Sequence, residues 1–155
     1  RVLLQERMIN AFETLKKFDQ VDKNKTGAIG FCFGGKCALD LARSGEDIKG
    51  VVSFHGLYDA PTASTGKHLK GTLKIDSSIL ILHGYDDPMA TPKSVIELAD
   101  ELNSKKAKWQ IHAYGNVGHA LTNPEANQKE SGLFYDQYAD EHSWNEMKNF
   151  FSKIF

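Results

Sequence analysis

Cys32 has the sequence surroundings of a catalytic nucleophile. It is the centre of Gly30-Phe31-Cys32-Phe33-Gly34, between a short apolar run and an amphipathic segment. A nucleophile on a sharp turn from strand to helix has strained backbone, so we expect small residues two positions away on either side. The helix N-terminus would favour a thiolate, and the N–H of Phe33 would point at an oxyanion. The alternative is a buried cysteine without a chemical role.

Two further segments carry groups that could complete a catalytic triad. Gly84-Tyr85-Asp86-Asp87 follows one apolar run, and Gly118-His119 follows another. Groups that follow different strands of an open α/β sheet meet at its carboxyl edge. The order nucleophile, acid, histidine is also one in which such triads occur along a chain. We therefore predict a cysteine–aspartate–histidine triad with either aspartate as the acid; a solvated turn is the alternative for the two aspartates.

Several other side chains lie near these motifs in the sequence. His55 follows an apolar run and could line the site or be an ordinary loop histidine. Tyr85 and Phe33 flank the predicted acid and nucleophile, and could contact substrate or pack locally. His83 and Cys37 are better explained by packing. Three histidines elsewhere show no metal-ligand spacing, so no metal site is predicted.

The segments between the motifs predict alternating strands and helices. Apolar runs predict strands at 26–31, 50–54, 78–83 and 109–113. Amphipathic spacing predicts helices over roughly 3–18, 34–43 and 92–102, the third with Thr91 as its N-cap. This alternation predicts an α/β fold with a mostly parallel sheet and helices on both faces, in a single domain over 1–155.

Two long loops complete the predicted organisation. They are expected at 56–77 and 115–141, before a last helix. Ser143 and Glu146 form a predicted capping box for that helix, and Trp144 is among the residues expected to face inward.

The composition narrows the classes of partner. The chain has 155 residues, 25% of them charged, and a formal net charge of −1. This charge gives no reason to expect nucleic acid or an anionic membrane as a partner. No apolar run reaches the ~18 residues that a membrane helix needs. Two cysteines and the lack of a signal-peptide pattern favour a cytoplasmic location.

Taken together, the motifs resemble those of the dienelactone hydrolase family of the α/β-hydrolase superfamily. The resemblance covers nearly the whole chain from about residue 26. It rests on Gly-Phe-Cys-Phe-Gly-Gly at 30–35, Leu-His-Gly-Tyr-Asp-Asp-Pro at 82–88, Tyr-Gly-Asn-Val-Gly-His-Ala-Leu-Thr-Asn-Pro at 114–124 and Trp-Asn-Glu-Met-Lys-Asn-Phe-Phe at 144–151. The family's Gly-x-x-Asp spacing implies that the acid is Asp87. The resemblance as a whole implies a cofactor-free enzyme that cleaves a small ester or lactone through Cys32, Asp87 and His119, with Phe33 N–H in the oxyanion hole.

The sequence departs from the family pattern in two respects. Family members have strands and a helix ahead of the nucleophile, which supply a second oxyanion N–H and a glutamate near the cysteine. This sequence begins at Arg1 within a predicted helix, so we expect an N-terminally truncated chain, the C-terminal portion of an α/β-hydrolase fold. The family arginine that helps hold the dienelactone carboxylate corresponds to Asn123. We therefore expect Asn123 to contact a substrate other than an anionic dienelactone.

Two other functions stay open at this point. A peptidase-like or thioesterase-like relative would use the same fold, although a peptide amine needs a well-placed acid because it leaves poorly. The second open function is that of a non-catalytic fragment or partner subunit. Four predicted strands would leave an exposed apolar sheet edge, and such an edge favours association with another chain. The macromolecular partners predicted for that edge are the missing N-terminal half or a second copy of the chain.

Overall fold

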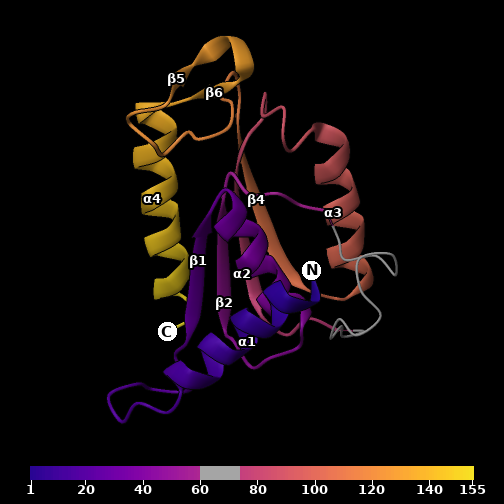
Figure 1. Cartoon of the computed structure of the whole chain (residues 1–155), viewed down its shortest axis with the longest axis vertical. Coiled ribbons are helices and arrows are strands. Elements are labelled where there is room, and N and C mark those ends of the chain that lie inside the picture. The colour runs from indigo at the N-terminus through magenta and orange to yellow at the C-terminus, as the bar shows by residue number, and fades with distance from the viewer. Residues whose placement is uncertain (60–73) are drawn as a thin grey trace.

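A four-stranded parallel sheet forms the centre of the fold (Figure 1). The structure is a computed structural model that describes residues 1–59 and 74–155, so most of the loop predicted at 56–77 lies outside the described residues. The strands pair in chain order: β1 (Gly27–Phe31), β2 (Gly50–Phe54), β3 (Ser78–Gly84) and β4 (Lys108–Tyr114). β2 is buried throughout and β3 almost throughout, as continuous apolar runs predict for strands covered on both faces.

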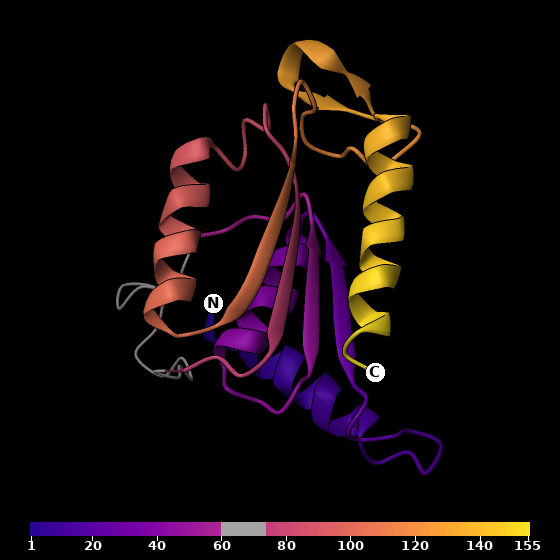
Figure 2. The same cartoon turned by 180° about the vertical axis from the view of Figure 1, so that it is seen from behind.

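Helices cover both faces of this sheet, which confirms the predicted α/β class (Figures 1 and 2). The helices are α1 (Val2–Leu15), α2 (Phe33–Arg43), α3 (Pro92–Ser104) and α4 (Gln137–Ser152). The core on one face joins side chains of α1, α2 and α3 to the sheet, among them Phe12, Leu39, Ile79 and Leu98. The core on the other face joins α4 to the sheet, through residues such as Phe54, Leu80, Leu82 and Met147.

The start of α4 differs from the prediction. The helix begins at Gln137, and the side chain of its N-cap Asp136 accepts a hydrogen bond from Ala139 N–H at 2.8 Å. Ser143 lies inside the helix and donates to the Asp140 carbonyl instead of capping. Trp144 is 45% exposed, so its predicted inward orientation is wrong. Aspartate caps as well as serine does, and the earlier cap begins the helix there.

The predicted loop at 115–141 contains a small antiparallel hairpin. It consists of β5 (Asn127–Gln128), the 3-10 helix η2 (Lys129–Ser131) and β6 (Leu133–Phe134). Each of its strands has only two residues, which is too short to produce a periodic sequence signal. Figure 2 shows the hairpin beyond the carboxyl ends of the parallel strands, next to the first turns of α4.

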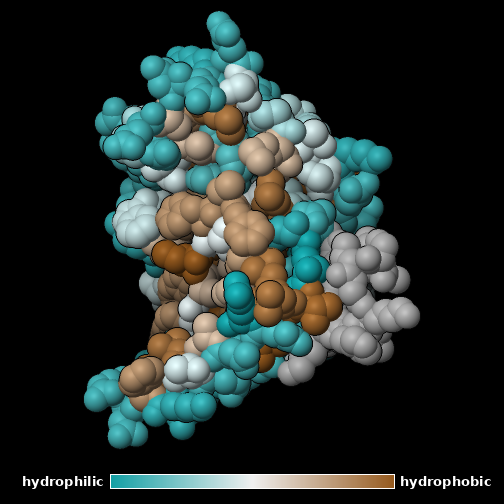
Figure 3. Space-filling view, in the orientation of Figure 1, coloured by the Kyte–Doolittle hydropathy of each residue, from teal (hydrophilic) through white to brown (hydrophobic). Residues whose placement is uncertain are grey.

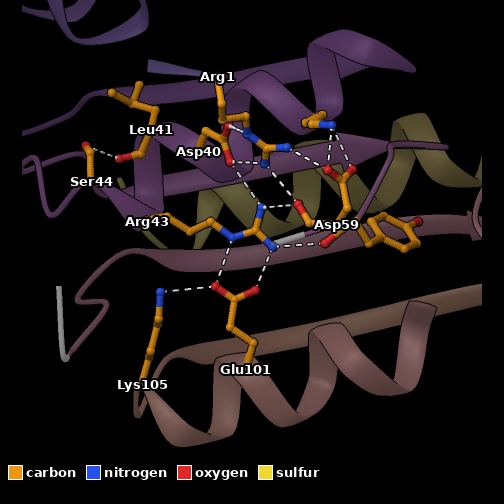
Figure 4. A network of polar contacts seen from close by, with 10 residues as sticks. Arg1, Asp40, Leu41, Arg43, Ser44, Asp59, Glu101 and Lys105 are labelled. Atoms are coloured by element: carbon orange, nitrogen blue, oxygen red, sulfur yellow. Dashed lines mark hydrogen bonds and ion pairs between the residues drawn. The ribbon is translucent and has the colours of Figure 1, made fainter. Parts of the chain in front are cut away.

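A network of buried ion pairs ties the helices on one face together (Figure 4). The Arg43 guanidinium lies 2.6 Å from Glu101 Oε2 of α3 and 3.1 Å from Asp40 Oδ1 of α2. Asp40, which is fully buried, also pairs with Arg1 at 2.6 Å. Each of these charges has an opposite partner, as burial requires.

No helix among the described residues is long and apolar enough to cross a membrane.

β1 forms one edge of the sheet and carries exposed apolar side chains. It pairs only with β2 in the described structure. Ile29 and Phe31 lie on the α4 face beside Val52 and Phe54, and are 45% and 40% exposed. Figure 3 shows apolar side chains gathered on this side of the molecule. The predicted open apolar edge is therefore present.

Candidate active site

Cys32 occupies a sharp turn between β1 and α2. Its φ of 52° is in the left-handed region, which non-glycine residues rarely adopt. A Cβ on Gly30 would lie 1.9 Å from the Gly34 carbonyl oxygen, and one on Gly35 would lie 2.4 Å from Ser53 Oγ. A Cβ on Gly34 would meet no described atom within 4 Å. The predicted steric requirement thus holds at Gly30 but not at Gly34, because β1 presses against the backbone of the first helical turn.

The same turn places Cys32 at the N-terminus of α2. Cys32 is the N-cap, and its carbonyl accepts hydrogen bonds from Gly35 N–H at 3.0 Å and Lys36 N–H at 3.4 Å. Its own N–H donates to the Phe54 carbonyl at 3.0 Å. Phe33 is the first helical residue, where an N–H has no acceptor within the helix. This N–H can donate to an anionic oxygen that forms next to the sulfur.

Asp87 is held rigidly after β3. The residue is 1% exposed, and its Oδ1 accepts hydrogen bonds from Met89 N–H at 2.7 Å and Ala90 N–H at 3.2 Å. Its Oδ2 lies 2.7 Å from His119 Nδ1. Asp86 is exposed, and only its backbone points toward the histidine loop, through a hydrogen bond to the Val117 carbonyl. Of the two candidate aspartates, the structure pairs Asp87 with the histidine.

His119 is positioned by the hairpin that the sequence did not reveal. Its N–H donates to the Gly132 carbonyl at 2.7 Å, and its carbonyl accepts from Phe134 N–H at 3.0 Å. His119 is 3% exposed, and burial by itself lowers the pKa of its imidazole. The hydrogen bond to Asp87, the charge of its carboxylate and the nearby Cys32 together outweigh burial and raise the pKa above its ordinary value.

The contact between His119 and Cys32 is looser than the contact with Asp87. His119 Nε2 is buried and makes no hydrogen bond of normal geometry to any described residue. Cys32 is still close enough to raise the pKa of the histidine. The Cys32 thiol is therefore near Nε2 but makes no well-aligned hydrogen bond with it. Catalytic hydrogen bonds commonly tighten only when substrate is bound.

The predicted substrate-contacting residues have very different environments. His55 is 4% exposed and lies next to His119, with 5.0 Å between ring centroids. Phe33, which follows Cys32, and Tyr85, two residues before Asp87, are each 54% exposed. Asn123 is exposed, and its side-chain oxygen accepts a hydrogen bond from Glu125 N–H within its own loop. The structure thus brings His55 to the site and gives Asn123 a local partner.

Two polar contacts near the site have no simple sequence signal. His55 Nε2 is 2.9 Å from Thr122 Oγ1, and Tyr58 hydroxyl is 3.2 Å from His83 Nδ1. The first joins the segment after β2 to the loop that carries His119, and the second joins that segment to β3, so sequence spacing cannot show them. Within residues 1–59 and 74–155, no group of three or more histidine, cysteine or carboxylate side chains could hold a metal ion.

Comparison with known proteins identifies similar sequences and structures. Residues 3–155 match the dienelactone hydrolase family. The chain is 36% identical to an uncharacterized protein of Caenorhabditis elegans, over 98% of this chain and 94% of that protein. It is 27% identical to a probable 2-oxo-3-(5-oxofuran-2-ylidene)propanoate lactonase of a Bradyrhizobium species, over 72% of this chain and 46% of the lactonase.

A solved structure extends this similarity to the fold. It is the crystal structure of a dienelactone hydrolase-like promiscuous phosphotriesterase from metagenomic libraries, which is 37% identical with a TM-score of 0.83. The match covers 98% of this chain and 62% of that protein. The chain therefore spans less than two thirds of this structural relative and about half of the lactonase.

Proposed function

We propose, because the chain belongs to the dienelactone hydrolase family, that it takes part in the hydrolysis of an ester or lactone by a thiol nucleophile. The observation that carries the proposal is the 2.7 Å contact between buried Asp87 and His119, at the edge where Cys32 begins α2. A nucleophile, a base and a group that orients the base are the parts required for covalent catalysis. The assignment of these roles to the three residues is part of the proposal.

The first half of the proposed reaction forms a thioester. His119 Nε2 takes the proton of Cys32, and the sulfur attacks the carbonyl carbon of the substrate. The carbonyl oxygen becomes an oxyanion, which the Phe33 N–H stabilises. When the carbon–oxygen bond to the leaving group breaks, His119 returns the proton to the departing alkoxide. Asp87 keeps Nδ1 protonated, so that Nε2 is free to accept the proton in the first step.

The second half restores the thiol. A water molecule gives a proton to His119 Nε2 and attacks the thioester carbon. The tetrahedral intermediate then expels the Cys32 sulfur, which takes the proton back, and the carboxylic acid leaves. The elevated pKa of His119, caused by Asp87 and Cys32 against the effect of burial, supports its role as the proton acceptor in both halves.

The surroundings of Cys32 support an uncharged substrate. The exposed side chains nearest to it in the chain are the aromatic rings of Phe31 and Phe33. Lys36, one helical turn further on, is paired with Asp59 at 2.7 Å. Asn123, at the position of the family arginine, carries no charge that could bind a carboxylate. We therefore propose a small neutral ester or lactone, bound with its apolar part on the two phenylalanines.

A phosphotriester is a second candidate substrate. The observation that favours it is the 37% identity to a structure described as a promiscuous phosphotriesterase. A neutral phosphotriester also presents an electrophilic centre and a leaving alkoxide or phenoxide to the same nucleophile. A peptide is a weaker candidate, because an amine leaves less readily and needs an additional well-placed acid.

The experiment compares the wild-type chain with Cys32→Ala and Cys32→Ser on a panel of substrates. The panel contains p-nitrophenyl acetate, an aliphatic lactone, a diethyl p-nitrophenyl phosphate and a peptide p-nitroanilide. We expect ester and lactone turnover in the wild type, an acetylated Cys32 in the mass spectrum, and loss of turnover in Cys32→Ala with unchanged circular dichroism. Full activity in Cys32→Ala, or turnover of the peptide alone, would refute the proposal.

The partner of this chain and its location are also proposals. We propose that the open edge of β1 is covered in the active protein, with a second copy of the chain as the partner that can be tested directly. The uncovered side chains of Ile29 and Phe31 support this. Both cysteines are free, which supports a reducing compartment such as the cytoplasm.

A further inference from the structure

His55 is a second buried histidine directly beside the candidate base. It follows β2, is 4% exposed, and has a φ of 36°, so its backbone is held in the left-handed region. A hydrogen bond of 2.7 Å from its N–H to the Leu82 carbonyl fixes this conformation. The ring meets the ring of His119 at 75°, with 5.0 Å between centroids. A strained residue that contacts a catalytic side chain suggests a specific role.

The side chain of His55 is also tied to the loop that carries His119. His55 Nε2 lies 2.9 Å from the hydroxyl oxygen of Thr122, three residues after His119. Between them, Ala120 has a φ of 62° and Leu121 is fully buried, so the loop turns sharply and its middle is anchored in the core. His55 therefore touches the His119 loop at two points, through ring packing and through a hydrogen bond.

His55 is an uncharged imidazole under ordinary conditions. Burial lowers its pKa to about 4, with a further lowering from the charge of His119 that outweighs the opposite effect of Asp87. A neutral ring can lie against the imidazolium that forms on His119 without repelling it as a second cation would. Among the described residues, no carboxylate is hydrogen-bonded to His55 as Asp87 is to His119, which distinguishes His55 from a second base.

We infer that His55 is a positioning residue, which with Thr122 holds the imidazole of His119 between Asp87 and Cys32. This inference rests on the proposed function. Asp87 restrains only one nitrogen of His119, and Nε2 has no well-aligned partner among the described residues. The ring could pivot about its Asp87 hydrogen bond if no side chain packed against it. His55 packs there and limits that motion, and Thr122 limits the motion of the loop.

The test uses variants that remove one element of this arrangement each. His55→Phe keeps an aromatic ring and removes the hydrogen bond, while Thr122→Val removes the hydroxyl and keeps the shape. Tyr58→Phe is the matched control, because it removes the hydroxyl at the other buried histidine, His83. The rates to measure are kcat and KM for p-nitrophenyl acetate and alkylation of Cys32 by iodoacetamide, each from pH 5 to pH 9.

We expect Thr122→Val and His55→Phe each to lower kcat by about tenfold at pH 7 with little change in KM, a small part of what general base catalysis contributes. Alkylation at pH 6 relative to pH 9 should fall in both variants and stay unchanged in Tyr58→Phe. The double variant should be no slower than the worse single variant, because both act through one contact. If His55→Phe does not fold, Thr122→Val still tests the inference.

Two results are distinguishable. Wild-type kcat and pH profiles in both variants, or additive losses in the double variant, would overturn the role of His55 and leave the proposed function intact. A wild-type protein without esterase activity, and with the alkylation profile of a free thiol, would instead overturn the proposed function and this inference with it.

Discussion

The two halves of the candidate site differ in how firmly this chain holds them. Asp87 and His119 are almost fully buried and are fixed by hydrogen bonds of 2.7 Å to the backbone and to each other. Cys32 is only partly buried, in the turn between the edge strand β1 and α2, and its neighbours Phe31 and Phe33 are 40% and 54% exposed. The proposed acid–base half is thus held firmly within the described structure, whereas the proposed nucleophile half borders an open sheet edge.

This difference follows from the position of each half in the sheet. β3 has a strand on either side, so the loop after it packs against the loop after β4. Among the described residues, β1 has a neighbouring strand on one side only, and the turn at Cys32 is held by α2 and by the hydrogen bond to Phe54 of β2. A hydrophobic strand edge without a partner is a site of association. The comparison teaches that the described residues hold Asp87 and His119 in place by themselves, whereas the turn at Cys32 lies next to a strand edge that they leave uncovered.

The largest effect should come from breaking the acid–base half. Asp87→Ala removes the only carboxylate among the described residues that is hydrogen-bonded to His119, so we expect kcat for p-nitrophenyl acetate to fall by about 10³- to 10⁴-fold. Asp86→Ala is the matched control, because Asp86 is exposed, and should retain activity within about twofold of the wild type. Equal losses in the two variants would mean that Asp87 does not serve as the orienting acid.

The next largest effect should come from a substitution that changes the backbone of the turn at Cys32. Gly30→Ala places a Cβ 1.9 Å from the Gly34 carbonyl, and we expect it to lower the free energy of unfolding by about 3 kcal/mol and to abolish turnover. Gly34→Ala has open space and should stabilise the helix by up to about 1 kcal/mol. Urea unfolding measures both changes, and a Gly30→Ala protein with wild-type stability would show that the elbow is not tight.

The pH dependence of stability should sharpen the picture of the acid–base half. Folded His55 stays neutral down to its pKa of about 4, whereas an unfolded histidine takes up a proton near pH 6.5. The unfolded state therefore binds more protons between these values, and stability falls as the pH falls through that window. The full shift corresponds to roughly 3 kcal/mol.

Urea unfolding of the wild type and His55→Phe from pH 4 to pH 7 measures this term. The variant should lose less stability on acidification, by roughly 2 kcal/mol at pH 4.5. His119 has the opposite sign, because its raised pKa gives a stabilisation that is present below pH 6.5 and lost as the pH rises through the folded pKa. Parallel curves for the two proteins would contradict the burial of a neutral His55.

The smallest effect on folding, and a direct test of the open half, should come from Ile29→Lys. A charge on the exposed face of β1 should reduce self-association of the chain in sedimentation experiments. Its free energy of unfolding should change by no more than about 0.5 kcal/mol. Ile96→Lys provides the control. Ile96 is 62% exposed on α3, the helix that connects β3 to β4, and these two strands do not pair with β1. Monomeric wild-type protein, or an equal response in both variants, would argue against association through β1.

Much of the fold could be predicted from local patterns. The strands and helices were located to within a few residues at most ends, and the parallel α/β class followed from their alternation. The errors lie where a pattern had a competitor. Ser143 and Glu146 resemble a cap, but Asp136 begins α4 earlier with the same hydrogen-bonding chemistry. The hairpin at 127–134 was missed because its strands are two residues long.

The sequence by itself determined which elements form and which residues follow each strand, because hydrophobic periodicity and turn chemistry act over a few residues. It thereby placed Cys32, the two aspartates and His119 at one edge of a sheet. Only the tertiary structure decided that Asp87 bonds to His119, that His55 and Thr122 flank it, and that Arg43 joins α2 to α3. The two partners in these contacts are separated by 32, 67 and 58 positions in the chain. The strength of each contact depends on its burial in the folded protein, which no local pattern encodes.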